Sequence, residues 1–168
     1  MKRLTILRHA KSSWDEPLDD FDRPLNARGR KAATMVGEEL KRRGATLDCV
    51  IASPAERVRQ TLDQLAKGYC APLDVHFDPR IYLASEDTLL DLIRGIPDDV
   101  GSALIVGHNP GLHRLVLLLT SEKGALRHRI ADNLPTAAVA GVELNAGRWS
   151  EVEPGSGVLS ELILPRDL

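Results

Sequence analysis

The 168-residue sequence contains few cysteines and few aromatic residues, and it has no long hydrophobic run. Its two cysteines, Cys49 and Cys70, lie far apart and outside any CxxC pair, which fits a reducing compartment better than a disulfide framework. The richest apolar stretch, residues 112–120, is too short and too charged to cross a bilayer. The uncharged stretch between Arg3 and Arg8 is too short for a signal-peptide core. We therefore expect a cytoplasmic protein with no membrane partner.

An excess of charge of one sign is also lacking. Charged residues make up 27% of the sequence, yet the formal net charge is only −2. Without an overall basic field, binding to nucleic acid or to an anionic membrane surface is not expected. Any site for an anion must therefore be local. The length fits a single domain that spans residues 1–168.

Several familiar patterns of phosphate chemistry are absent as well. The sequence contains no GxxxxGK[ST], and residues 155–157 lack the third glycine of a dinucleotide-binding loop. Neither Cys49 nor Cys70 has an arginine six positions later, which excludes the cysteine-phosphatase mechanism. Asp20 and Asp22 have the spacing of an aspartyl phosphotransferase pair, but no apolar strand precedes them. Phosphate chemistry, if present, must use other residues.

Strand-like and helix-like segments alternate along most of the chain. Apolar residues recur with the 3.6-residue period of a helix in segments that follow short apolar strands. The predicted strands are 4–7, 49–53, 73–77 and 102–107, and the predicted helices are 26–44, 54–66, 86–96 and 110–120. Three late strands are predicted at 136–144, 147–152 and 157–164, some of them antiparallel at the sheet edge. The pattern predicts a three-layer α/β/α fold with a mainly parallel central sheet and helices on both faces.

Two of the predicted strands are closely followed by a histidine. Arg8 and His9 follow the strand 4–7, and His108 follows the strand 102–107. Asn109 is placed to cap a helix that starts at Pro110, which leaves His108 at the strand tip. Because the carboxyl ends of parallel strands share one edge of a sheet, these side chains are expected to converge.

A third junction follows the strand 49–53. Ser53 and Glu56 have the spacing of a capping box, and Pro54 fits the first helical position. This places Arg57 in the opening turn of a helix, at the same edge of the sheet. We therefore predict that Arg8, His9, Arg57 and His108 surround one pocket.

Arginines and histidines in one pocket suit a phosphoryl group. Guanidinium groups match phosphate oxygens in bidentate geometry, and helix N-termini add N–H donors. Arginines push a neighbouring histidine toward its neutral form, which is a nucleophile that can form a covalent phosphohistidine. No metal is expected, because His108 and His113 lack the i, i+4 spacing of two zinc ligands on one helix face. The plainer interpretation, that each residue is a solvated group at a strand end, is weakened by the three repeated junctions.

Four segments together resemble the histidine phosphatase superfamily, and within it the small SixA-type phosphohistidine phosphatases. They are RHAKSSW at 8–14, DRPLNARGRKAA at 22–33, SPAERVRQT at 53–61 and GHNPGL at 107–112. The similarity extends from about Leu4 to the strands past Thr136. It implies a phosphoglycerate mutase-like fold.

The resemblance also implies a role for individual residues. His9 matches the phosphorylated nucleophile, Arg8 and Arg57 match the arginines of the phosphate pocket, and His108 matches the second pocket histidine. Arg23 matches a basic position of this branch that reaches toward the pocket.

The sequence also departs from the wider superfamily at two points. Ala10 stands where many members have glycine. The larger relatives carry a glutamate acid after the third strand, and the nearest equivalent here, Glu86, matches that motif poorly. A phosphohistidine leaving group needs such an acid less than an alcohol does, because its imidazole can leave protonated.

The leading hypothesis is therefore a metal-independent phosphatase without a cofactor. It would work through a phosphohistidine enzyme intermediate and act on phosphohistidine in a partner protein, such as a histidine phosphotransfer domain. One alternative is a phosphomonoesterase for a small phosphate ester, with Glu86 or Asp15 as the acid. The other alternative is a non-catalytic phosphate-binding module, which the presence of both His9 and His108 disfavours.

Overall fold

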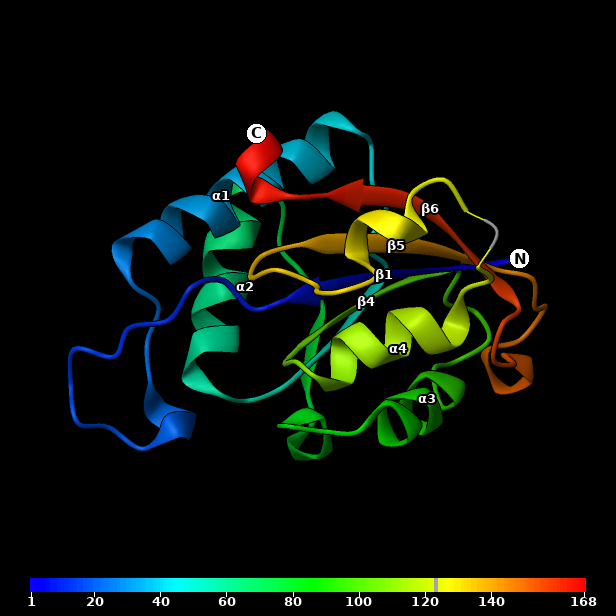
Figure 1. Cartoon of the computed structure of the whole chain (residues 1–168), viewed down its shortest axis with the longest axis horizontal. Coiled ribbons are helices and arrows are strands. Elements are labelled where there is room, and N and C mark those ends of the chain that lie inside the picture. Colours follow the sequence, from blue (N-terminus) through cyan, green and yellow to red (C-terminus); the bar gives the residue numbers. More distant parts are fainter. Residues whose placement is uncertain (123) are drawn as a thin grey trace.

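The computed structural model describes residues 1–122 and 124–168, which form a six-stranded sheet with the order β3-β2-β4-β1-β5-β6 (Figure 1). The strands are β1 (Lys2–Arg8), β2 (Cys49–Ala52), β3 (Val75–Phe77), β4 (Ser102–Gly107), β5 (Val139–Leu144) and β6 (Gly157–Ile163). Strands β1 to β4 are mutually parallel, whereas β5 and β6 each run antiparallel to the preceding neighbour in the sheet. The prediction of a mainly parallel sheet is therefore only partly right. The predicted neighbourhood of β2, β4 and β1 is confirmed.

Four helices cover the two faces of this sheet: α1 (Ala27–Arg42), α2 (Glu56–Tyr69), α3 (Glu86–Arg94) and α4 (Gly111–Leu119) (Figure 1). Strand side chains alternate between the faces, so Leu4 and Ile6 of β1 pack with α3 and α4, while Leu7 packs with α1 and α2. One apolar cluster therefore lies on each face of the sheet, between the sheet and a pair of helices. This arrangement gives the three layers that the sequence pattern predicts. In the described part of the chain, no helix has the length and apolarity that crossing a membrane requires.

The predicted strand at 147–152 is wrong. Residues Trp149–Glu151 form a short 3-10 helix instead. Trp149 and Val152 are both fully buried, and their i, i+3 spacing suits one turn of helix rather than strand alternation. The Trp149 Nε1–H donates to the Val100 carbonyl at 2.7 Å, which fixes the turn against the start of β4.

Two helix starts also differ from the prediction. Helix α2 begins at Glu56, its N-cap is Ala55, and no side chain caps it, so the predicted capping box and the predicted place of Pro54 are wrong. Ser53 lies before the helix, and its Oγ accepts from the Ala55 N–H at 3.2 Å. Helix α4 begins one residue later than predicted, at Gly111. Arg57 nonetheless lies in the first turn of α2, as expected.

The segment between β1 and α1 extends beyond the edge of the sheet as a long loop, blue in Figure 1. Its only regular element among the described residues is the 3-10 helix η1 (Asp20–Asp22). The two ends of the loop are joined, because Ser13 N–H donates to the Pro24 carbonyl and Asn26 N–H donates to the Lys11 carbonyl. Gly29 makes this closure possible, since a Cβ there would lie 2.1 Å from the Lys11 oxygen.

Candidate active site

The carboxyl ends of β1 and β4 bring two histidines together. Arg8 pairs with Gly107 in the parallel register, so His9 and His108 follow directly after adjacent strand ends. Their ring centroids are 5.3 Å apart. Arg57 reaches the same place from the first turn of α2, and its Nη2 lies 3.1 Å from His108 Nδ1.

These residues line one pocket of about 450 Å³ at the edge of the sheet. The lining also includes Arg23, so the structure brings together all five residues that the sequence singled out. The full lining is Arg8, His9, Lys11, Ser12, Trp14, Asp20, Arg23, Arg57, Leu83, His108, Asn109 and Thr136.

The His9 ring is held in one tautomer. Its Nδ1 lies 2.7 Å from the Ala10 carbonyl, which can only accept, so Nδ1 carries the proton and Nε2 keeps its lone pair. Burial, and to a smaller degree the charges of Arg57 and Arg8, lowers the pKa of His9 to about 4. At neutral pH, His9 is therefore a neutral imidazole with an unprotonated Nε2, which is the form that a nucleophile requires.

His108 is held in the opposite tautomer. The Arg57 Nη2–H donates to Nδ1, so the proton is on Nε2, which donates to Ser53 Oγ at 2.8 Å. Burial, followed by the charge of Arg57, lowers the pKa of His108 to about 3. The Ser53 side chain thus positions His108, a role that the capping-box interpretation concealed.

Two arginines keep buried donors unused. Arg57 is 3% exposed, and its Nη1 and Nη2 donate to the backbone and the carboxylate of Asp20. Arg8 donates from Nη1 to the Leu134 carbonyl at 3.1 Å. The Nε–H groups of both arginines are buried and have no hydrogen-bond partner among the described residues. Unpaired buried donors are costly, and both belong to arginines that line the pocket, whose guanidinium groups suit an anion.

Asp20, which the sequence analysis considered only as half of an aspartyl phosphotransferase pair, is a pocket residue. Its carboxylate accepts from Tyr82 Oη at 2.5 Å, from Arg57 Nη2 at 3.0 Å and from Arg23 Nη2 at 3.2 Å. These hydrogen bonds, led by that of Tyr82, hold the pKa of Asp20 at about 2. Asp20 is therefore ionised at neutral pH and joins the two arginines into one network. The sequence feature that indicates this role is the position of Asp20 three residues before Arg23, with which it forms an ion pair.

Arg23 is also fixed in place. The residue is 6% exposed, it donates to Ser12 Oγ at 2.7 Å, and its guanidinium lies 3.4 Å from the centroid of the Trp14 ring. Stacking on an aromatic face together with these hydrogen bonds limits its motion. Arg23 can therefore present a fixed positive charge to the pocket.

The two acids considered from the sequence lie elsewhere. Neither Asp15 nor Glu86 belongs to the pocket lining, in which Asp20 is the carboxylate among the described residues. Glu86 is the first residue of α3. The structure therefore supports neither of them as the proton donor.

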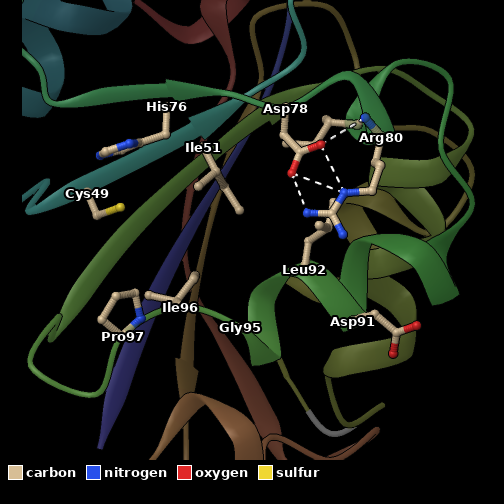
Figure 2. Close-up of a pocket in the computed structure, with 11 residues that line it drawn as sticks. Cys49, Ile51, His76, Asp78, Arg80, Asp91, Leu92, Gly95, Ile96 and Pro97 are labelled. Carbon is tan, nitrogen blue, oxygen red and sulfur yellow. Dashed lines mark hydrogen bonds and ion pairs between the residues drawn. The ribbon is translucent and has the colours of Figure 1, made fainter.

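A second pocket, of about 360 Å³, lies against β2 and α3 (Figure 2). It contains Cys49, at the end of β2 remote from Ser53, and burial raises the pKa of that thiol. Asp78 and Arg80 pair with each other there at 2.7 Å (Figure 2). A protonated thiol, and an arginine whose charge is already paired with Asp78, are poor ligands for a phosphate group.

Metal ligands do not cluster in the described part of the chain, where no three His, Cys, Asp or Glu side chains could hold an ion. Metal independence of the reaction stays a prediction.

The two low histidine pKa values predict how stability depends on pH. The unfolded chain takes up protons on His9 and His108 near pH 6.5, whereas the folded protein does so only near pH 4 or below. The free energy of unfolding should therefore be fully retained above about pH 6.5 and fall toward pH 4, by about 1.4 kcal/mol per pH unit for each histidine. Chemical denaturation across this range measures the slope. It should be shallower in His9→Asn, and an equal slope in both proteins would contradict the expectation.

Three comparisons place these observations among known proteins. The sequence profile of the histidine phosphatase superfamily (branch 1) matches residues 4–82. An uncharacterised protein of Mycobacterium tuberculosis is 36% identical over 163 residues, which cover 95% of this chain and 100% of that protein. A candidate phosphohistidine phosphatase SixA from Agrobacterium tumefaciens has a similar structure, with a TM-score of 0.83 and 27% identity over 98% of each chain. The protein histidine phosphatase SixA in complex with tungstate is 21% identical with a TM-score of 0.81, and 98% of each chain is covered.

Proposed function

We propose that this chain, which belongs to the SixA-type branch of the histidine phosphatase superfamily and is therefore a phosphatase, removes the phosphoryl group from phosphohistidine on a partner protein. The reaction uses His9 as the nucleophile and needs neither metal nor cofactor. Arg8, Arg23 and Arg57 bind the phosphoryl oxygens, and His108, held between Arg57 and Ser53, keeps Arg57 in place beside them.

The proposed reaction has two steps. His9 Nε2 attacks phosphorus, the bond from phosphorus to the substrate imidazole breaks, and the phosphoryl group is carried by His9. Water then attacks the phosphohistidine, which releases inorganic phosphate and restores the neutral imidazole of His9. The guanidinium groups offset the charge on the phosphoryl oxygens in both steps, the task that metal ions perform in other phosphoryl-transfer sites.

The observation that carries the substrate proposal is the state of Asp20. An alcohol leaving group has a pKa far above 7 and needs a proton from a positioned acid. Asp20 is held ionised by Tyr82, Arg57 and Arg23, so it is a poor proton donor at neutral pH. An imidazole leaving group can take its proton from water as it departs. This pocket is therefore better suited to phosphohistidine than to an alkyl phosphate ester.

A parallel comparison of rates tests this proposal. The substrates are a histidine phosphotransfer domain phosphorylated with phosphoramidate, phosphoserine, and p-nitrophenyl phosphate, whose leaving group needs little protonation. General acid catalysis contributes roughly 10²–10⁴-fold, so we expect kcat/KM for the phosphohistidine domain to exceed that for phosphoserine by at least about a hundredfold. p-Nitrophenyl phosphate should fall between the two.

Each alternative has its own outcome in this experiment. Equal or faster turnover of phosphoserine would favour the small-ester phosphatase. Failure to turn over any of the three substrates would favour the non-catalytic binding module. Loss of activity in EDTA that a divalent cation restores would contradict the metal-independent mechanism.

A further inference from the structure

Exposed apolar side chains gather on two segments that contribute residues to the phosphate pocket. Eight large apolar residues are exposed in the described chain, and four of them lie on the loop before α1 or directly after Tyr82. These four, which we call the apolar rim, are Trp14, Leu18, Phe21 and Leu83. Trp14 and Leu83 line the pocket itself, and the Phe21 ring packs edge-on against Tyr82. Three of the four rim residues therefore lie at or beside the phosphate site, and Leu18 lies between two of them in the sequence.

The rim is held open to solvent. Trp14 is 76% exposed although its ring stacks on Arg23, and the loop that carries it is closed at its base by backbone hydrogen bonds. With the loop closed at its base and Trp14 stacked on Arg23, these side chains face solvent rather than the core. Clustered apolar exposure of this kind marks an interaction site.

Leu83 adds an independent observation. Its backbone has φ +52, in the left-handed region that side chains other than glycine rarely adopt, and the residue is 57% exposed. Such a conformation is strained, and an exposed leucine gains little packing energy that could offset the strain. Strain of this kind tends to persist at functional sites.

We propose that the apolar rim binds the partner protein beside its phosphohistidine, at a segment that carries an apolar residue and flanking Lys or Arg. The proposal rests on the phosphatase function proposed above. The basic flank follows from charge, because five exposed acidic residues lie on the same loop, Asp15, Glu16, Asp19, Asp20 and Asp22. Of the two cations of the loop, Lys11 is exposed and Arg23 is buried. A free metabolite whose phosphoryl group fills the pocket would not extend over these side chains.

Three phosphohistidine substrates separate docking from chemistry. They are free phosphohistidine, a peptide with Leu and Lys on either side of the phosphohistidine, and the same peptide with Glu in place of Leu and Lys. We expect kcat/KM for the Leu/Lys peptide to exceed that for free phosphohistidine by roughly tenfold, mainly through KM, and the Glu peptide to show no gain.

Variants of the rim complete the test. Leu83→Gly relieves the backbone strain while it removes the side chain, so the protein should stay folded with an unchanged or higher melting temperature, and the ratio of peptide to free phosphohistidine turnover should fall toward one. Leu18→Ser should lower the same ratio. Val158→Ser, at an equally exposed apolar site on β6, is the matched control and should leave the ratio unchanged.

The outcomes distinguish the two proposals. Equal kcat/KM for the Leu/Lys peptide and free phosphohistidine, or a ratio that the rim variants do not change, would overturn the docking proposal while leaving the phosphatase function intact. If no phosphohistidine substrate is turned over while p-nitrophenyl phosphate is, the proposed function fails and the docking proposal fails with it.

Discussion

Replacing His9 with alanine is expected to abolish turnover. His9 is the pocket residue whose imidazole keeps an unprotonated Nε2 with no hydrogen bond from the described residues, because its Nδ1–H is bound to the Ala10 carbonyl. His108 cannot take over, since both of its ring nitrogens are engaged, by Arg57 and by Ser53. Without a nucleophile, the covalent intermediate cannot form.

Trapping of the intermediate measures this directly. With a radiolabelled phosphohistidine substrate, rapid denaturation during turnover should leave acid-labile phosphate on the wild-type protein and none on His9→Ala. His76→Ala is the matched control, because His76 is an exposed histidine outside the pocket, and it should retain both turnover and labelling. Turnover of His9→Ala at near the wild-type rate would show that the mechanism is wrong.

The convergence of Arg8, His9, Arg57 and His108 could be predicted from the sequence because the signal is local and topological, whereas Arg23 was indicated only by the family resemblance. Arg8, His9 and His108 each follow a recognisable strand, and parallel strands place their carboxyl ends at one edge. The β2-β4-β1 neighbourhood was predictable for the same reason. Their roles in the reaction remain predictions that the experiments above test.

The roles of Asp20 and Ser53 could not be predicted in this way. Asp20 starts the short 3-10 helix η1, and its partners Arg57 and Tyr82 are 37 and 62 residues away, so no local pattern joins them. At Ser53 the capping-box spacing was misleading, because no side chain caps α2. The Ser53 hydroxyl instead accepts a hydrogen bond from His108, 55 residues away. The apolar periodicity of the sequence therefore predicts where the site lies, whereas the hydrogen bonds within the site join residues far apart in the sequence and are visible only in the structure.

Replacing Arg57 with alanine should lower kcat/KM by roughly two to three orders of magnitude. Loss of one pre-organised donor to a developing charge typically costs about 2.7–4 kcal/mol in transition-state stabilisation. Arg57 holds such a position, because it lines the pocket, is buried and is fixed by two hydrogen bonds to Asp20. Arg59→Ala, on the same helix but at the surface, is the matched control and should retain activity.

A second measurement separates this loss from simple misfolding. The charge of Arg57 contributes to the low pKa values of both His9 and His108, so Arg57→Ala should raise both in a histidine NMR titration of the folded variant. Arg57→Lys keeps a positive charge but loses the planar fork, so it should shift the two pKa values less while still losing most of the rate. This combination would show that Arg57 acts through directed hydrogen bonds as well as through charge. Wild-type activity in Arg57→Ala would instead mean that the phosphoryl group is bound without it.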